Sequence, residues 1–237
     1  MKKCIIIIPL HTFDLKDYEI MSLKQLWSFY YNKYDDIDIG IIYPDNLDIY
    51  ELEKYNINLN NIITFKTNLY WLSSPYAYNS YIVSNFLYNL VLDYEYILIH
   101  QLDSFIFKDE LHYWCDKGYD YLGGFDSLLI LYNHIVNLNG GFSLRKTSVF
   151  NEITKQPLVE LLPLYGSCED RLFTEYVYKD KCNIPIDDLL KFSIDIYNYA
   201  HIAFFNLLRN ELPFGCHAFQ KSQYVYDLCK YNINYKE

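Results

Sequence analysis

Residues 96–107 read Tyr-Ile-Leu-Ile-His-Gln-Leu-Asp-Ser-Phe-Ile-Phe, and this stretch indicates the fold more strongly than any other. Its opening apolar run is typical of a strand that is covered on both faces of a sheet. The run leads into Asp103, and α/β sheets place their chemistry at the carboxyl ends of their strands. Asp103 is therefore the first candidate for a metal or ligand contact, although an aspartate would also suit a cap of the next turn.

The size and charge of the chain limit the classes of protein to which it can belong. Its 237 residues suit one α/β domain, and we find no linker-like region and no internal repeat. The formal net charge of −10 argues against nucleic acid and against an anionic membrane surface as partners, because both attract clustered Lys and Arg. We expect the small basic clusters to be solvated surface: Lys2-Lys3, Arg145-Lys146, and Lys179 with Lys181.

Neither the apolar runs nor the cysteines indicate export. The longest strongly apolar run, Cys4 to Leu10, is interrupted by Pro9 and is far shorter than the roughly 20 residues that span a bilayer. No signal peptide is evident. The six cysteines form no C-x-x-C pair and show no zinc-like spacing, so we expect reduced thiols in a cytoplasmic protein.

Apolar strands alternate with amphipathic helices in the first half of the chain. Helical spacing joins Ile20 to Tyr34, and a second helix is expected over 82–91 with Asn79 as its cap. Strands are predicted at 4–9, 37–43, 62–65 and 95–101. This order predicts an α/β fold with a mostly parallel central sheet flanked by helices on both faces.

The second half of the chain is less regular. Helices are predicted near 109–117, 159–165 and 170–178, and extended segments at 119–123, 140–144 and 192–197. We expect a single domain over residues 1–237. Within it, residues 1–107 would form a nucleotide-binding half and residues 108–237 an acceptor-binding and catalytic half.

Two segments of the second half carry glycines or acids that core packing does not require. Asn139, Gly140 and Gly141 open a predicted strand, and glycines there let the backbone approach a ligand closely, although a hairpin turn would use the same pair. Glu169 and Asp170 open a predicted helix. Acidic residues at that position also stabilise a helix by capping it and by interacting with its dipole.

An acid and a histidine near the C-terminus complete the candidate set. Asp195 lies in a short predicted strand, where it would equally suit a solvent-facing position. His217 lies in an apolar turn, where a histidine is more often a packing residue than a ligand. Beside Asp103, however, it would supply donors that suit Mn²⁺ or Mg²⁺ and leave positions open for phosphate oxygens.

Taken in order, these motifs resemble the small bacterial GT-A-type glycosyltransferases that are catalogued mainly as a domain of unknown function and are linked to polysaccharide biosynthesis at the cell surface. The resemblance covers nearly the whole chain. It implies a GT-A-like nucleotide-sugar-binding fold and a hexosyltransferase-type glycosyltransferase. The residues that carry it are the opening Ile-Ile-Pro strand, 19–26, Tyr78-Asn79, 96–107, 119–123, 139–146, Glu169-Asp170, Phe192-Ser193 and 213–219.

The same resemblance implies how the donor and a divalent metal, Mn²⁺ or Mg²⁺, are held. GT-A enzymes usually carry Asp-x-Asp where this chain has Gln101-Leu102-Asp103, so Asp103 would bind the metal and Gln101 would bond ribose or sugar. His217 looks like the C-terminal metal ligand. The residues implied in donor binding are Pro9, His11, Thr12, Tyr78, Asn79, Gln101, Leu102, Asp103, Asn139, Gly140 and Gly141.

Asp170, next to Glu169, resembles the catalytic carboxylate of inverting GT-A enzymes, which takes the proton of the acceptor hydroxyl as its oxygen attacks the anomeric carbon. If Asp170 only caps its helix, retention stays open. The partners implied are a nucleotide sugar, foremost a UDP-sugar, and a glycan or lipid-linked acceptor. The Leu- and Ile-rich residues 125–137 replace an expected acceptor loop, and they would contact such a lipid, a membrane surface or a partner subunit.

Two other interpretations of the sequence stay open. A catalytically inactive relative would bind a nucleotide sugar or a partner enzyme without turnover, and Gln101 in place of an acid favours it. A glycoside hydrolase would use two carboxylates such as Asp103 and Asp170. It would leave His217 and the Gly-Gly pair without roles.

Overall fold

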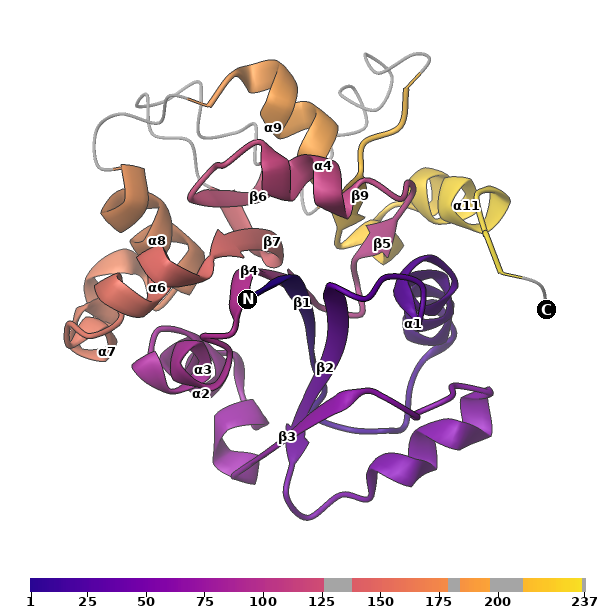
Figure 1. Cartoon of the computed structure of the whole chain (residues 1–237), viewed down its shortest axis with the longest axis horizontal. Helices are drawn as coiled ribbons and strands as arrows, with labels where there is room; N and C mark the ends of the chain where they lie inside the picture. The colour runs from indigo at the N-terminus through magenta and orange to yellow at the C-terminus, as the bar shows by residue number, and fades with distance from the viewer. Residues whose placement is uncertain (126–137, 179–183, 197–210, 236–237) are drawn as a thin grey trace.

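A computed structural model describes residues 1–125, 138–178, 184–196 and 211–235. Its centre is one continuous sheet with helices on both sides (Figure 1). The predicted α/β class, with a mostly parallel sheet flanked by helices, is therefore confirmed. The loop expected to meet the acceptor lies, apart from Phe125, outside the described residues.

The nine-stranded sheet of the described chain has the order β3-β2-β1-β4-β7-β6-β8-β9-β5. Strands β5 and β7 run antiparallel to their neighbours, and the other pairings are parallel. The strands are β1 Lys2–Pro9, β2 Ile37–Pro44, β3 Ile63–Thr67, β4 Tyr94–His100, β5 Phe105–Ile106, β6 Tyr121–Phe125, β7 Leu138–Lys146, β8 Ser193–Asp195 and β9 Gly215–His217.

Helices of uneven length connect these strands. The α-helices are α1 Asp17–Tyr30, α2 Pro75–Ile82, α3 Asn85–Leu90, α4 Leu111–Asp116, α6 Thr147–Ile153, α7 Leu158–Leu161, α8 Glu169–Tyr178, α9 Ile186–Phe192 and α11 Gln223–Tyr231. Short 3₁₀ helices are η1 Ile49–Tyr55, η2 Leu69–Leu72, η4 Leu162–Tyr165 and η5 Phe219–Lys221. Within the described residues, none of the helices has both the length and the apolar character needed to cross a bilayer.

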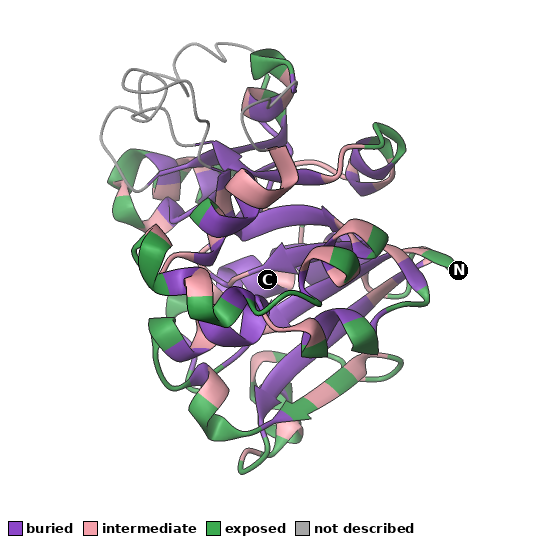
Figure 2. Cartoon of the chain, turned by 90° about the vertical axis from the view of Figure 1, so that its left-hand side faces the viewer, coloured by how far each residue is buried: buried purple, intermediate pink, exposed green. Residues whose placement is uncertain are grey.

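Strands β1 and β4 form the centre of the core. Residues 5–8 of β1 and 96–99 of β4 are fully buried, and Figure 2 shows these strands inside a shell of half-buried and exposed helices. Parallel strands need helices on both faces because their side chains have no access to water on either side. The run of apolar residues at 96–99 is thus explained by its position in the sheet.

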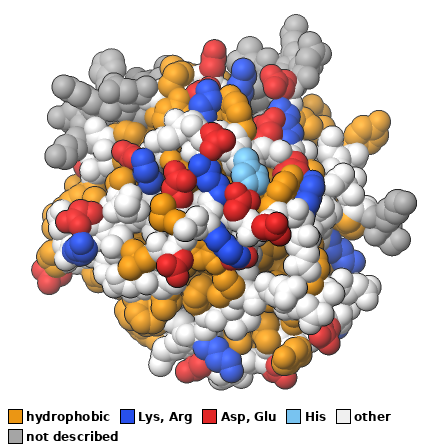
Figure 3. Space-filling model, in the orientation of Figure 1, with side chains coloured by type: hydrophobic (Ala, Val, Ile, Leu, Met, Phe, Trp, Pro, Cys, Tyr) orange, Lys and Arg blue, Asp and Glu red, His pale blue; other side chains and the backbone are white. Residues whose placement is uncertain are grey.

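The structure corrects two details of the sequence analysis. The helix expected over 82–91 with Asn79 as its cap is two helices, because Ser74 accepts a hydrogen bond from the Ala77 amide and starts α2 earlier, with Pro75 in its first turn. Arg145 was expected on the solvated surface, but its side chain is fully buried. On the face of the molecule that Figure 3 shows, exposed Lys and Arg side chains are interspersed among Asp and Glu side chains.

A buried amide joins helix α1 to β5 and to the C-terminal segment. The Gln25 side chain donates to the Ile106 carbonyl at 2.9 Å and to the Asn232 carbonyl at 3.2 Å, and it accepts from the Asn234 amide at 2.8 Å. These bonds hold both β5 and the segment after α11 against α1. Each of the three backbone groups would lack its partner if the amide were removed.

We therefore expect Gln25→Met, which keeps the side-chain length, to lower the free energy of unfolding by about 2–3 kcal/mol, because it leaves buried polar groups unpaired. Urea unfolding followed by circular dichroism measures the change. Ser28→Ala on the same helix is the matched control, with an expected loss of less than about 1 kcal/mol. Equal losses in the two variants would contradict this account of Gln25.

Candidate functional site

A cavity of about 730 Å³ lies at the edge of the sheet where β1 and β4 end and β7 begins. The structure brings every residue that the resemblance implied in catalysis, donor binding or metal binding into its lining, whereas the weaker candidate Asp195 is not among the lining residues. Shared location leaves their individual roles as predictions. These residues are Pro9, His11, Thr12, Tyr78, Asn79, Gln101, Leu102, Asp103, Asn139, Gly140, Gly141, Glu169, Asp170 and His217.

The antiparallel pairing of β4 with β7 assembles one wall of the cavity. His100 at the end of β4 is paired with Phe142 in the middle of β7. Just beyond this pair, the Gln101 amide donates to the Gly141 carbonyl at 2.9 Å, and the Ser104 hydroxyl donates to the same carbonyl at 3.2 Å. The segment that carries Asp103 therefore lies against the Gly-Gly segment.

Strands β8 and β9 supply the histidine and its partner. They are parallel, with Asp195 in register with His217. An Asp195 carboxylate oxygen lies 3.1 Å from His217 Nδ1, and an Asp103 oxygen lies 3.3 Å from His217 Nε2. Asp195 is 4% exposed, so the solvent-facing position considered for it from sequence is wrong.

The two carboxylates dominate the electrostatics of this histidine. Burial by itself would lower the pKa of His217, but Asp103 and Asp195 outweigh it and raise that pKa to about 10. Burial by itself would raise the pKa of Asp103. The charge and hydrogen bond of His217, together with a hydrogen bond from Gln220, outweigh burial and lower that pKa. Each side chain therefore favours the charged form of the other.

Asp103 and His217 fit a divalent cation. Two ligands at right angles, each about 2.1 Å from a Mg²⁺-sized ion, lie about 3 Å apart, which is close to the 3.3 Å between the Asp103 oxygen and His217 Nε2. With Asp195 holding Nδ1–H, Nε2 would present a lone pair once its proton is displaced. Among the described residues, no group of three His, Cys, Asp or Glu is arranged around a metal position.

The two glycines leave room for this arrangement. A Cβ atom on Gly141 would lie 2.3 Å from His217 Nε2 and 2.7 Å from the Gln101 amide oxygen. A Cβ atom on Gly140 would lie 2.3 Å from a Glu169 carboxylate oxygen. All three distances are shorter than ordinary Cβ contacts, so a side chain at either glycine would displace His217, Gln101 or Glu169. Both glycines lie within β7, so the hairpin turn considered from sequence is not their reason.

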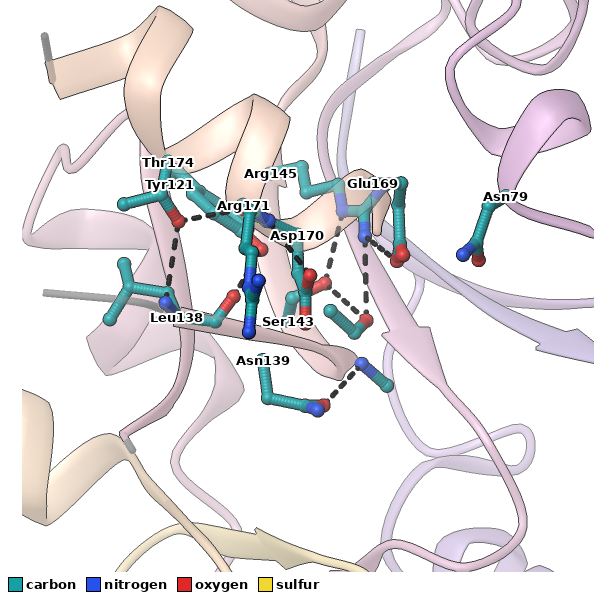
Figure 4. Close-up of polar contacts among 12 residues, drawn as sticks. Asn79, Tyr121, Leu138, Asn139, Ser143, Arg145, Glu169, Asp170, Arg171 and Thr174 are labelled. Atoms are coloured by element: carbon teal, nitrogen blue, oxygen red, sulfur yellow. Dashed lines mark hydrogen bonds and ion pairs between the residues drawn. The ribbon is translucent and has the colours of Figure 1, made fainter. Parts of the chain in front are cut away.

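Arg145 explains why Glu169 can be buried. Its guanidinium lies 3.7 Å from the Glu169 carboxylate and donates to the Ser143 and Tyr88 hydroxyls. It also lies over three aromatic rings, those of Tyr121, Phe150 and Phe173. Figure 4 shows Glu169 beside Arg145, with Asp170 on the neighbouring position of α8. The buried cation is the counter-charge for a carboxylate in the cavity wall.

Asp170 has the opposite electrostatic environment. Burial, together with the neighbouring charge of Glu169, raises the pKa of Asp170 to about 7. The Asp170 carboxylate also accepts a hydrogen bond from the Arg171 amide at 2.8 Å. A carboxyl group whose pKa lies near 7 can accept or give up a proton at neutral pH.

Sequence reasoning missed several residues of this site. Lys16, which directly precedes α1, is the one Lys or Arg that lines the described part of the cavity, whereas four carboxylates do so. The sequence signal for Lys16 was its place in the loop between β1 and α1, the same loop that carries His11 and Thr12. Arg145 could not be found in this way because its neighbours are aromatic side chains from separate elements, and the weight of Asp195 depended on the register of β8 with β9.

The first prediction of the site concerns the partner of the histidine. Asp195→Asn should weaken binding of Mn²⁺ by about 10- to 100-fold, because an amide orients the imidazole less strongly than a carboxylate and does not raise its basicity. Isothermal titration with MnCl₂ measures the affinity. Asp187→Asn, which changes a carboxylate on α9 away from the cavity, is the control. Unchanged affinity would remove Asp195 from this role.

A second prediction concerns pH and stability. Because the folded-state pKa of Asp170 is about 7 and so lies above its ordinary value, its stabilising contribution is complete below about pH 4 and is lost as pH rises towards 7. Asp170→Asn stays neutral, so its advantage over the wild type should grow by roughly 2–3 kcal/mol between pH 5 and pH 8. Urea unfolding at the two pH values tests this. Asp14→Asn serves as an exposed control, and a difference that does not change with pH would contradict the assignment.

Comparison with known proteins places this geometry in a recognisable fold. The structure is similar to the galactosyltransferase LgtC in complex with donor and acceptor sugar analogues, with a TM-score of 0.61, 13% identity, and coverage of 90% of this chain and 86% of that one. It is also similar to the bifunctional glycosyltransferase WbbM, with a TM-score of 0.58, 13% identity, and coverage of 98% of this chain and 49% of that one. Mouse xyloside xylosyltransferase 1 is similar with a TM-score of 0.51, 8% identity, and coverage of 91% of this chain and 96% of that one.

These similarities show a shared GT-A glycosyltransferase fold, as the sequence motifs implied. No curated protein matches the sequence. The family described as "Protein of unknown function (DUF5672)" matches residues 60–217, which include most of the cavity residues. The chain belongs to this family.

Proposed function

We propose that this protein is a glycosyltransferase that moves a sugar from a nucleotide-sugar donor, foremost a UDP-sugar, to a hydroxyl group of a glycan or glycolipid acceptor. The observation that carries the proposal is the pair Asp103 and His217, side by side in the cavity of a fold shared with glycosyltransferases. In this proposal residues 1–107 chiefly bind the nucleotide, and residues 108–237 supply the acceptor and catalytic groups.

The charges of the cavity favour a donor that binds together with a cation. Glu19, Asp103, Glu169 and Asp170 line it, and Lys16 is the one Lys or Arg among its described lining residues. A diphosphate would be repelled by these acids unless a divalent ion neutralised both. This balance supports Mn²⁺ or Mg²⁺ held by Asp103 and His217, although Gln101 replaces the first acid of the usual pattern.

Donor positions follow from this placement. The sugar would lie along Asn139, Gly140 and Gly141, where the absence of side chains leaves the cavity floor open and the Asn139 amide oxygen already accepts from the Gly141 amide at 2.8 Å. Gln101 would hydrogen-bond ribose or sugar. The base would lie towards His11 and Thr12, beyond the end of β1.

We assign the role of general base to Asp170. Its pKa of about 7 lets the carboxylate accept a proton at neutral pH, which is the condition for an efficient base. The acceptor oxygen would give its proton to Asp170 and bond to the anomeric carbon, while the bond from that carbon to the diphosphate breaks and the diphosphate leaves with the electron pair. Attack opposite the leaving group inverts the anomeric centre.

Glu169 would act beside this base, because its carboxylate lies 3.7 Å from the Arg145 guanidinium and contributes to the high pKa of Asp170. A bound divalent metal would supply stabilisation of the charge on the departing diphosphate. The catalytically inactive alternative keeps the donor and metal contacts of this scheme and lacks only the transfer.

The experiment that tests the proposal is a thermal-shift panel of UDP-, GDP-, CMP- and dTDP-sugars with and without Mn²⁺, since a ligand of the native state raises the melting temperature by mass action. We expect one nucleotide class to give a shift that depends on the metal. A panel without any shift would contradict the donor assignment. A shift without turnover of any acceptor would favour the inactive relative.

Variants separate the roles within the site. Asp103→Ala and His217→Ala should each abolish the metal-dependent part of the shift, whereas Asp170→Asn should keep the shift and lower kcat by about 10²- to 10⁴-fold. The matched control is Asp227→Ala, which removes an exposed carboxylate on α11. Loss of donor binding in all three site variants alike would overturn the division into metal ligands and base.

A further inference from the structure

Residues 67–92 contain no Asp, Glu, Lys, Arg or His, although the chain as a whole is 21% charged and about five charges would be expected over this length. The segment forms η2, α2 and α3. Burial does not explain the missing charges, because many of these residues are exposed. A surface helix normally carries charged residues on its outer face.

Large apolar side chains occupy the exposed positions instead. Tyr70 is 57% exposed, Phe86 55% and Leu92 50%. The full set, which we call the uncharged surface, is Leu69, Tyr70, Tyr76, Phe86, Leu90 and Leu92. Clustered exposed apolar residues mark interaction surfaces, whereas scattered ones need no explanation.

Ring contacts join the three elements of the uncharged surface. Tyr70 packs on Trp71 with ring centroids 5.3 Å apart, and Tyr81 lies 5.9 Å from both Trp71 and Phe86. Leu90 lies one helical turn after Phe86 on α3. Figure 1 shows α2 and α3 packed together on the side of the molecule that Figure 2 turns towards the viewer.

The uncharged surface adjoins the cavity. Residues 72–75, which connect η2 to α2, line the cavity. Tyr76 follows them directly, and Tyr70 lies two residues before them. Caps fix both sides of this connection: Asn68 accepts from the Tyr70 amide at 2.9 Å, and Ser74 accepts from the Ala77 amide at 3.2 Å. The exposed rings of Tyr70 and Tyr76 are therefore carried on two capped helix starts beside the cavity.

We propose that the uncharged surface is a docking site for the interfacial region of an electrically neutral lipid bilayer. Tyr side chains with apolar rings and polar hydroxyls suit the level of the lipid headgroups, and Phe and Leu suit the acyl chains beneath. The absence of carboxylates removes the cost of taking charge out of water, and the absence of Lys and Arg leaves nothing to select anionic lipids.

Other partners explain less of this pattern. Stacking of a glycan would use Tyr70 and Tyr76 but would give no role to Phe86, Leu90 or Leu92. Protein interfaces are enriched in Arg within their buried centre, whereas residues 67–92 contain none, and the exposed charges Lys66 and Asp93 lie only at the ends of the segment. Where the proposed function also holds, docking would bring the cavity rim to the membrane, and the acceptor would then be lipid-linked.

Vesicle flotation tests the docking. The full-length protein should float with phosphatidylcholine vesicles, no better when phosphatidylglycerol is added, and equally at about 0.1 M and 0.5 M NaCl, where charge interactions are screened differently. The double variant Phe86→Ser, Leu90→Ser should reduce binding at least about tenfold. The matched control is Ile186→Ser, Tyr231→Ser, which removes two exposed apolar side chains elsewhere and should bind as the wild type does.

A second readout locates the contact. Trp71 is half-buried, whereas Trp27 and Trp114 are buried, so brominated phosphatidylcholine should quench mainly Trp71, and Trp71→Phe should abolish the quenching. No flotation, flotation only with anionic lipid, or equal binding by both double variants would overturn the proposal. A wild-type dimer that Phe86→Ser, Leu90→Ser dissociates, without vesicle binding, would assign the surface to a second copy of the chain.

The donor panel keeps this inference separate from the proposed function. Phe86 and Leu90 are not among the residues that line the cavity, so their double variant should keep the thermal shift with the nucleotide sugar. Flotation without any donor shift would leave the docking site standing while the proposed function fails. A thermal shift with the nucleotide sugar but no flotation would support the proposed function and overturn the docking site.

Discussion

The candidate site depends first on the antiparallel pairing of β4 with β7. In a parallel sheet the start of one strand and the end of its neighbour lie at opposite edges, about the length of a strand apart. Here the reversal brings the end of β4, with Gln101 and Asp103, against the start of β7, with Gly140 and Gly141. A carboxylate and an open stretch of backbone thus meet at one edge of the sheet.

The buried guanidinium of Arg145 extends this arrangement to the carboxylates of α8. The register of β4 with β7 pairs Arg145 with Ile97 in the centre of the sheet, far from water. A charge there is tolerated because Glu169, two hydroxyl groups and three aromatic rings surround it. The position of Glu169, and through it the electrostatics of Asp170, therefore depend on the same strand pairing.

The sequence predicted those parts of the fold that depend on local patterns. The apolar runs predicted β1, β2 and β4, and an acid directly after a buried strand indicated Asp103, whereas most of the other cavity residues were implied by the family resemblance. Asn79 was misassigned because Ser74-Pro75 is a stronger helix start than a lone asparagine within an apolar run. Arg145 and Asp195 were misjudged because burial at those positions comes from strand pairings that are distant in sequence, which local patterns do not contain.

Backbone strain lies next to the functional side chains. Ser167 and Ala218 adopt φ values of 59° and 58°, a conformation that costs non-glycine residues about 1–2 kcal/mol, whereas the other described non-glycine residues of this kind are asparagines, which tolerate it. The Ser167 carbonyl accepts from the Asn79 side chain at 2.6 Å just before Glu169, and Ala218 lies between His217 and Phe219, whose amide donates to the Asp103 carbonyl. Both strained residues therefore set the direction in which the chain enters or leaves the site. Because glycine would relieve the strain at lower cost to the folded backbone, its absence at both positions agrees with a site in which restricted backbone freedom holds carboxylate and imidazole in place.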